Sequence, residues 1–405
     1  MMIPQRTLSQ VAMITMGTSP KGDTYNQDGS GLPLLNGPTE FGPTYPNCTL
    51  FSTDSKRECR PGDLIFCVRG STTGRMNWAD RVYSLGRGVC SIRGEATTDT
   101  RFIKYCLDWK LEALLKYAGG GTFPNLTQDT IRDFEIPFPE HRRKIAAILS
   151  SYDDLIENNL RRIKILEEMA QNLYREWFVK FRFPGHQHAR FTDSPLGRIP
   201  DGWEVVPLED IVNLCRKGVQ PQNFPDELFE HFSFPAYDSG KLPAIEKGQT
   251  IKSGKYEVPL NCVLVPKLNP HIPRVWLPRP SNDIRSIAST EYLILEPKKY
   301  STAFYYVLFS SPEMVEKLAG RADGTSTSHK RLKPGDFLEQ LTVAPPDSLT
   351  EAFDSLVVPA MDLVISLIYK NTALRRTRDL LLPRLISGEV DMSELDITIP
   401  KEFNA

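Results

Sequence analysis

Apolar residues recur at helical spacing through the middle of the chain. Between Ile145 and Trp177 the spacing alternates strictly between four and three residues, with one polar break at Asn159. This heptad pattern predicts one helix of about 36 residues, or ~54 Å, too long to lie across a single small domain. The helix is therefore expected to bridge two domains or to pair with another helix. The positions are Ile145, Leu149, Tyr152, Ile156, Asn159, Ile163, Leu166, Ala170, Leu173 and Trp177.

A second copy of this pattern lies in the C-terminal half. FEIPFP at 134–139 matches LTVAPP at 341–346, an offset of 207 residues, and a long helical segment follows each. Pro359 is expected to kink the second helix or to break it near its start. At this offset Leu149, Ile156 and Leu173 correspond to Leu356, Leu363 and Leu380, while the second helix has its own seven-residue spacing at Phe353, Ala360, Leu367, Leu374 and Leu381. The predicted partner-helix seam comprises Ile145, Leu149, Ile156, Ile163, Leu166, Leu173, Trp177, Leu356, Leu363, Leu367, Leu374 and Leu381.

The repeat extends upstream of both helices. CRPGDLIFCVRG at 59–70 resembles EVPLNCVLVPKL at 257–268, and each copy indicates a turn, a short apolar strand and a polar loop. LKYAGGGT at 115–122 likewise matches LAGRADGT at 318–325. The chain is therefore predicted to be mixed α+β, with two tandem globular domains of strands and short helices, each followed by one long helix. The expected boundaries are a first domain at 1–140, a first long helix at 141–183, a Pro/Gly/His-rich linker at 184–203, a second domain at 204–346, a second long helix at 347–388 and a C-terminal tail at 389–405.

Catalytic signatures are scarce. The sequence has no phosphate-binding G-x-x-x-x-G-K-[ST] loop, no G-x-G-x-x-G and no Asn/Asp-Pro-Pro-aromatic signature of a base methyltransferase. Its seven cysteines include no C-x-x-C pair, so we expect reduced, mostly buried thiols and no metal site. A scattered acidic nuclease site stays open as an alternative, because Asp and Glu are plentiful. With no run of 18 apolar residues and no signal-peptide pattern, the expected location is the cytoplasm, without a membrane.

Three polar loops carry the residue types that contact nucleic acids. They are RGSTTGRMNW at 69–78, PKLNPHIPRVW at 266–276 and GTSTSHKR at 324–331. Arg and Lys can address guanine, Asn can address adenine, and small hydroxyls suit phosphates. For any single residue, an ordinary solvated loop with one buried Trp is the competing interpretation. The candidate DNA-binding residues are Arg69, Ser71, Thr72, Thr73, Arg75, Asn77, Trp78, Thr122, Lys267, Asn269, His271, Arg274, Thr325, Lys330 and Arg331.

Over nearly its whole length the chain resembles the specificity subunits of type I restriction-modification enzymes. The resemblance is carried by PGDLIF, the GGT loop, FEIPFPEHRRKIAAILSSYDDLIENN, QNLYREWFVKFRF and LLLPRLISGEVDM, in this order and with a duplicated plan. His141 stands where members often have Gln. The second copy lacks the Arg-Arg-Lys cluster of 142–144, so contacts made by that cluster need not exist there.

The resemblance implies a DNA-binding role in host defence. Each globular domain would be a target-recognition domain for one half of a split double-stranded DNA target, and the two long helices would pack antiparallel as a coiled-coil spacer. Two modification (methyltransferase) subunits that bind S-adenosylmethionine and ATP-driven restriction subunits would be the partners, while this subunit itself would have no cofactor and no activity. The alternatives are a two-domain DNA-binding regulator, a cryptic nuclease and a purely structural coiled-coil scaffold.

Overall fold

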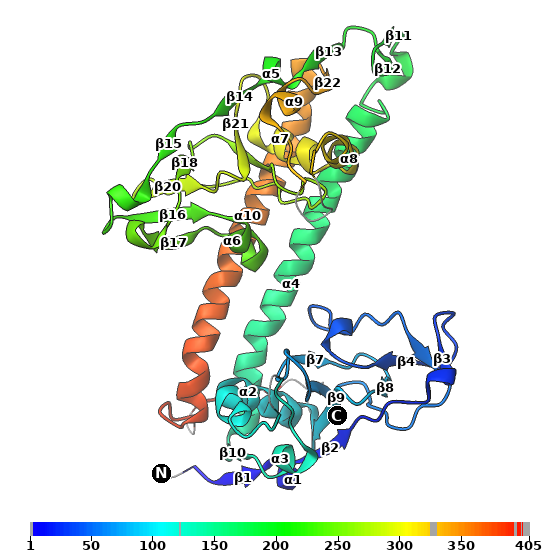
Figure 1. Cartoon of the computed structure of the whole chain (residues 1–405), viewed down its shortest axis with the longest axis vertical. Helices are drawn as coiled ribbons and strands as arrows, with labels where there is room; N and C mark the ends of the chain where they lie inside the picture. Colours follow the sequence, from blue (N-terminus) through cyan, green and yellow to red (C-terminus); the bar gives the residue numbers. More distant parts are fainter. Residues whose placement is uncertain (1–2, 121–122, 325–329, 393–394, 398, 400–405) are drawn as a thin grey trace. The chain divides into compact units, whose positions relative to one another are not determined.

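The chain divides into two compact units, each of which contains one globular domain and part of both long helices. The computed structural model describes residues 3–120, 123–324, 330–392, 395–397 and 399. The first unit comprises Met1–Ile156 and Leu374–Ala405, and the second comprises Glu157–Ala373. The elements of both are labelled in Figure 1.

The first unit is built on two small four-stranded sheets. The order of one is β2-β9-β6-β7, all antiparallel, and that of the other is β3-β5-β4-β8, with β4 and β8 parallel. A separate antiparallel pair, β1 with β10, closes the domain beside the first long helix. The strands are β1 (Gln5–Thr7), β2 (Ala12–Met16), β3 (Tyr25–Asn26), β4 (Leu32–Leu35), β5 (Phe51–Ser52), β6 (Leu64–Cys67), β7 (Met76–Trp78), β8 (Ser84–Leu85), β9 (Val89–Gly94) and β10 (Glu135–Pro137); the helices are α1 (Leu8–Val11), α2 (Thr97–Leu115), α3 (Gln128–Arg132) and the short 3₁₀ turns Gly22–Thr24 and Pro38–Glu40.

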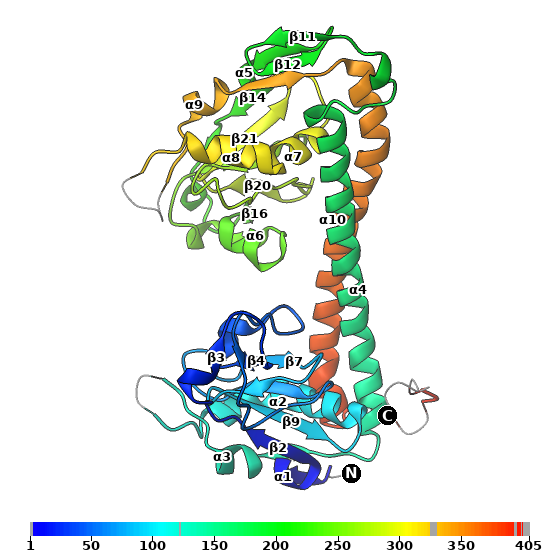
Figure 2. The same cartoon turned by 90° about the vertical axis from the view of Figure 1, so that its right-hand side faces the viewer.

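Helix α2 lies across the sheet that contains β9, as Figure 2 shows. Strand β6 is buried at every position, as expected for a short apolar strand in the middle of a sheet. The core around it also receives Leu385, Ile386 and Met392, which come from the last turn of the second long helix and the segment after it. The C-terminal part of the chain thus completes the core of the N-terminal domain.

The second unit repeats this framework. Its pair β13 with β22 corresponds to β1 with β10, and its antiparallel sheet β14-β21-β19 corresponds to β2-β9-β6. The remaining sheet differs, with five strands in the order β15-β18-β20-β16-β17. The strands are β13 (Glu204–Pro207), β14 (Val212–Cys215), β15 (Gly218–Val219), β16 (Leu228–Phe232), β17 (Ala244–Lys247), β18 (Lys255–Glu257), β19 (Val263–Pro266), β20 (Arg285–Ala288), β21 (Tyr292–Pro297) and β22 (Leu341–Ala344); the helices are α5 (Leu208–Ile211), α6 (Phe234–Gly240), α7 (Thr302–Ser310), α8 (Pro312–Gly320), α9 (Pro334–Leu338) and the 3₁₀ turns Pro221–Asn223 and Gly248–Thr250.

The segment predicted as a linker contains ordered structure. Strands β11 (Phe191–Ser194) and β12 (Gly197–Pro200) form an antiparallel hairpin within it, after a 3₁₀ turn at His186–His188. Phe181 packs edge-to-face on Phe191 and on Trp203, which attaches the hairpin to the end of the first long helix. Pro and Gly mark the hairpin turn rather than an extended connection.

Both long helices are present. α4 (Arg142–Tyr174) is followed directly by a π-helical turn, Arg175–Val179, and α10 (Asp347–Ile386) has 40 residues. The break expected at Pro359 is absent, since α10 runs through that residue without interruption. Packing of one face against the domain and α4 offsets the lost backbone hydrogen bond.

Within each unit α4 and α10 are antiparallel. In the second unit Asn159 donates its amide to Asn371 at 2.8 Å, and the ring of Tyr174 packs on Phe353 with centroids 6.3 Å apart. In the first unit Asp153 of α4 is paired with Arg378 of α10. The polar break in the heptad pattern, Asn159, is 4% exposed and therefore faces its partner inside the seam.

Two positions of the predicted seam in α10 were wrong. Leu356 and Leu363 are 57% and 37% exposed, while the residues that follow them, Val357 and Val364, are 2% and 4% exposed. One residue turns a side chain by about 100° around a helix, so an alignment that is one residue short selects the neighbouring face. The helix's own seven-residue spacing identifies the buried face, because Phe353 and Leu367 lie in the core. The other seam positions are buried (Ile145, Leu149, Ile156, Ile163) or half-buried (Leu166, Leu173, Trp177, Leu374, Leu381).

Among the described residues, α10 is also the one helix long and apolar enough to cross a membrane. Its most apolar 18-residue window has a mean hydropathy of 1.7, and 28% of that window is buried. Core helices of globular proteins can have the same length and hydropathy, so these two properties alone do not indicate a membrane span. One face of this window, including Phe353, Val357, Met361 and Val364, belongs to the core of the second unit.

Candidate nucleic-acid interface

In the first unit, the loop after β6 lies against a second loop that is distant in sequence. Arg69 and Gly119 each form an isolated antiparallel bridge with Asn125, and the Arg69 Nε donates to the Asn125 side-chain oxygen at 3.1 Å. The Thr73 hydroxyl donates to the Pro124 carbonyl at 3.0 Å. Residues 69–75 therefore form one surface with Gly119 and residues 123–125 at the end of a buried strand.

The second unit has the same arrangement after the equivalent strand β19. Leu268 and Asp323 both form bridges with Arg331, and the backbone N–H of Asn269 donates to the Lys330 carbonyl at 2.7 Å. The loop of 267–274 is thus held against Lys330 and Arg331. Equivalent pairs of loops, with different side chains, follow equivalent strands in the two domains.

Glycine at two positions fixes the shape of the first loop. Gly70 and Gly74 have φ angles of +103° and +95°, a region that favours glycine. A Cβ at Gly74 would also lie 2.7 Å from the side chain of Leu111 in α2. These turns direct the intervening side chains away from the core, and Ser71 is exposed.

Most of the predicted DNA-binding residues that the structure describes reach the surface of these loops. Arg75 is exposed, with its guanidinium 6.0 Å from the ring of Phe41. Arg331 pairs with Glu291 at 2.8 Å, yet its side chain is 60% exposed. Two predicted residues, Thr122 and Thr325, lie outside the described residues. The exposed members are Arg69, Ser71, Arg75, His271 and Arg331, and the half-buried ones are Thr72, Thr73, Lys267, Asn269 and Lys330.

Three predicted contact residues have structural roles instead. Asn77 is 5% exposed and its amide donates to the Gly42 carbonyl at 2.9 Å. Trp78 lies in β7 and packs against the core of the first unit. The guanidinium of Arg274 makes two 2.8 Å hydrogen bonds to Asp238, with its side chain 19% exposed. Burial of Asn77, core packing of Trp78 and pairing of Arg274 with Asp238 make these side chains unavailable to bases or phosphates.

Sequence reasoning missed two residues of the first surface. Asn125 joins the two loops, as described above, and Phe123 is 58% exposed beside it. An aromatic side chain within the polar run GGGTFPN was the available signal for Phe123. Nothing local indicated Asn125, because its partner Arg69 is 56 residues away.

The basic cluster of 142–144 holds the first helix in place. Arg142 and Arg143 each contact the carboxylate of Asp99 at 2.8 Å, and that carboxylate is buried in the first turn of α2. Lys144 donates to the backbone carbonyl of Leu395 at 2.8 Å. The second unit, which lacks the cluster, fastens its helix differently, through a 2.7 Å hydrogen bond from the Ser301 hydroxyl to Asp354. The cluster is therefore not a free patch for DNA phosphates.

The cysteines and acidic residues form no evident reactive centre in the described part of the chain. All seven cysteines are free thiols, and burial raises the pKa of Cys48 and of Cys59 to about 12. Such thiols stay protonated at neutral pH and are poor nucleophiles. No group of three or more His, Cys, Asp or Glu side chains that could hold a metal ion occurs among the described residues.

Comparison with known proteins gives a consistent result. The family model described as the type I restriction modification DNA specificity domain matches residues 5–168, which cover the first domain and most of α4. The type I restriction enzyme MjaIX specificity subunit of Methanocaldococcus jannaschii is 29% identical over 83% of this chain and 79% of its own length. The HindI specificity subunit of Haemophilus influenzae is 23% identical over 67% of this chain and 72% of its own.

The fold comparison agrees. The crystal structure of the type I restriction-modification S subunit from M. genitalium covers 96% of both chains, with a TM-score of 0.61 and 16% identity, and so shows a shared fold. Family model, sequence relatives and fold all point the same way. Residues 5–168 thus match the type I restriction modification DNA specificity domain, and the chain resembles type I restriction enzyme specificity subunits in sequence and shares the fold of an S subunit.

Proposed function

We propose that each globular domain reads one half of a bipartite DNA target. The observation that carries this proposal is the repeated pair of loops, which stands at the end of β6 in one domain and of β19 in the other. The framework under the loops is shared, whereas the exposed side chains differ. Two domains with one plan and different contact residues are suited to two different short sequences.

The side chains on the two loop surfaces would make the contacts to DNA. On the first surface Arg69 and Arg75 can donate two hydrogen bonds to guanine or pair with phosphates, and Ser71 can bind a phosphate oxygen. On the second, His271 and Arg331 are the exposed groups, with Lys330 half-buried beside them. The chain has a net charge of −1. Electrostatic attraction of the DNA backbone would therefore come mainly from these local patches and from partner subunits.

The long helices would act as the spacer and as the docking surface for two modification subunits. At 1.5 Å per residue, α4 and α10 measure about 50 and 60 Å, enough to span more than one turn of DNA. In the second unit, four large apolar side chains are exposed to solvent: Leu356 and Leu363 of α10, and Ile165 and Met169 of α4. Such surfaces on a helix pair suit apolar helices of a partner.

The remaining parts of the enzyme would be supplied by partners. Modification subunits would carry S-adenosylmethionine, and restriction subunits would use ATP. The assembly would act on chromosomal and incoming DNA in the cytoplasm. This chain would contribute sequence recognition and geometry, with no cofactor of its own.

Genome-wide mapping of methylated bases tests the proposal. Cells that express this chain with its modification subunit should methylate one split motif, with two specified parts and an unspecified spacer of constant length. Cells with the modification subunit alone should lack this mark. A continuous motif, or no mark despite a soluble, assembled complex, would contradict the proposal.

A further inference from the structure

In the second unit, one carboxylate of α4 holds the recognition domain. The Glu167 carboxylate accepts hydrogen bonds from Lys241 Nζ at 2.8 Å and from the Tyr306 hydroxyl at 2.9 Å. Lys241 follows α6 and Tyr306 lies in α7, so both donors belong to the globular domain. One helical turn further on, Gln171 donates to the Val307 carbonyl at 3.0 Å. We name Glu167, Lys241 and Tyr306 the second clamp.

A similar set, whose cation lies on α10 and not in the domain, occurs in the first unit. The Asp153 carboxylate of α4 accepts a hydrogen bond from the Tyr105 hydroxyl of α2 at 2.6 Å and pairs with Arg378 of α10. Tyr105 occupies the domain helix α2, as Tyr306 occupies α7. Asp153, Tyr105 and Arg378 form the first clamp. Each clamp joins an α4 carboxylate, a tyrosine hydroxyl of the domain helix and a cation.

The tyrosines act as donors in both clamps. Burial, and after it the neighbouring carboxylate, raises the pKa of Tyr306 and of Tyr105. Each hydroxyl therefore keeps its proton and can donate it to the ionised carboxylate. Hydrogen bonds to charged groups are stronger and more directional than those between neutral groups.

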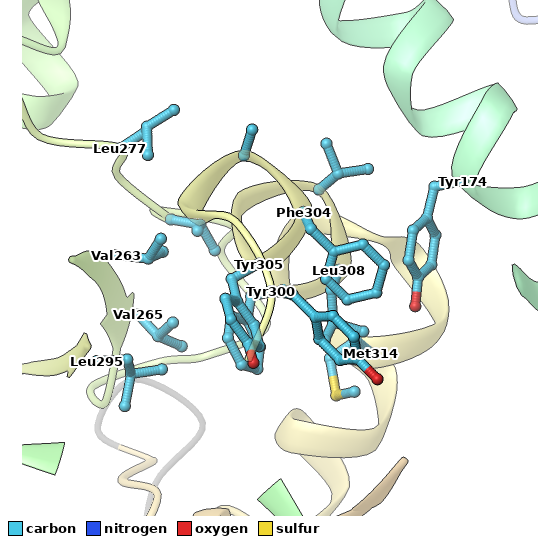
Figure 3. Packing of buried hydrophobic residues seen from close by; sticks show 14 of the residues in the cluster. Tyr174, Val263, Val265, Leu277, Leu295, Tyr300, Phe304, Tyr305, Leu308 and Met314 are labelled. Carbon is cyan, nitrogen blue, oxygen red and sulfur yellow. The ribbon is translucent and has the colours of Figure 1, made fainter. Parts of the chain in front are cut away.

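Apolar packing also joins the domain to α4 beside the second clamp. Figure 3 shows α7 side chains such as Phe304 and Leu308 in the apolar cluster that also contains Tyr174 of α4. Apolar contacts of this kind are non-directional. A cavity of about 30 Å³, lined by residues that include Glu167, Trp276 and Met361, also interrupts the packing between the domain and the two helices. The clamp supplies the directional contact at this place.

We infer that the two clamps fix the register and rotation of each recognition domain on α4, and that Glu167 and Asp153 are positioning residues for the spacer length of the DNA target. This inference rests on the proposed function. If a domain can shift along or around its helix, its loops reach bases at more than one separation. Loss of a clamp therefore relaxes the choice of spacer without changing the bases that the loops read.

Spacer selectivity of the assembled methyltransferase is the test. Methylation rates are measured on duplexes that carry the two half-sites with the natural spacer, and with a spacer one base pair shorter or longer. The wild-type complex should prefer one spacer strongly. In Tyr306→Phe and Glu167→Gln the ratio of rates between the natural and altered spacers should fall by about tenfold, the value of one charge-assisted hydrogen bond. Asp153→Asn and Tyr105→Phe should act in the same direction.

A matched control lies beside the clamp. Glu168→Gln removes a carboxylate that is 58% exposed and contacts Lys164 at 3.8 Å, so its spacer ratio should equal that of the wild type. If Glu167→Gln does not fold, Tyr306→Phe, which removes one oxygen atom, carries the test. Unchanged ratios in the clamp variants, or an equal loss of rate at every spacer, would overturn the inference. A wild-type complex that recognises no split target would instead overturn the proposed function.

Discussion

Replacing Phe353 with alanine should destabilise the second unit by about 3–5 kcal/mol. Phe353 is fully buried, and its ring lies 5.1 Å from Phe178, 5.9 Å from Phe304 and 6.1 Å from Trp177, centroid to centroid. Truncation leaves a cavity where α10, α4 and α7 meet, because these rings cannot all move inward. Denaturant unfolding, or hydrogen exchange of α7 and of α4 beyond Glu157, measures the loss.

The control for this prediction lies three residues along the same helix. Leu356→Ala removes a side chain that is 57% exposed, so it should change the free energy of unfolding by less than about 0.5 kcal/mol in the isolated chain. A similar loss in both variants would contradict the corrected seam. Because Leu356 is also part of the proposed docking surface for a modification subunit, Leu356→Ala should weaken assembly while leaving the stability of the isolated chain unchanged.

Replacing Asp99 with alanine should destabilise the first unit by about 3 kcal/mol. The Asp99 carboxylate is 1% exposed and contacts the guanidinium groups of Arg142 and Arg143, so its removal leaves two cations without their partner. Breaking a buried ion pair costs about 3–5 kcal/mol, and the partly exposed arginines place this site at the lower end. The acidic group also stabilises the N-terminal turn of α2.

The readout for Asp99→Ala is hydrogen exchange in α2 and the first turns of α4. Exchange there should accelerate, whereas exchange in the second unit should not change. Glu95→Ala is the control, since this carboxylate is 86% exposed and 4.0 Å from Arg143. Stability and exchange equal to those of the wild type would contradict this structural role of the basic cluster.

The framework could be predicted from the sequence because its signals are local. FEIPFP and LTVAPP became β10 and β22, and the strands of PGDLIF and NCVLVP became β6 and β19. The heptad pattern of α4 identified a real helix but left open whether Asn159 was solvated or inside the seam; the structure buries it. In α10 the alignment of the two copies was short by one residue. The prediction therefore named Leu356, whereas Val357 is the buried residue.

The surface of the site could not be predicted in the same way. Residue type suggested Asn77 and Arg274 as DNA contacts, but burial and pairing with Gly42 and Asp238 give them structural roles. These partners lie 35 and 36 residues away, so no local pattern shows them. The pairing of the loop at 69–75 with Asn125 is equally non-local. Most of the predicted loop residues lie at the surface, whereas the neighbours of the loops and their buried members could be identified only from the fold.

The measurement that tests the central claim most directly is a map of methylated bases after exchange of the first loop's exposed side chains. Ser71, Thr72 and Arg75 are replaced together, while Gly70, Thr73 and Gly74, which shape the loop, are kept. The account predicts that one half of the split motif changes or loses its specificity, while the other half and the spacer length stay as in the wild type. A change in both halves, or an unaltered motif from an active complex, would contradict it.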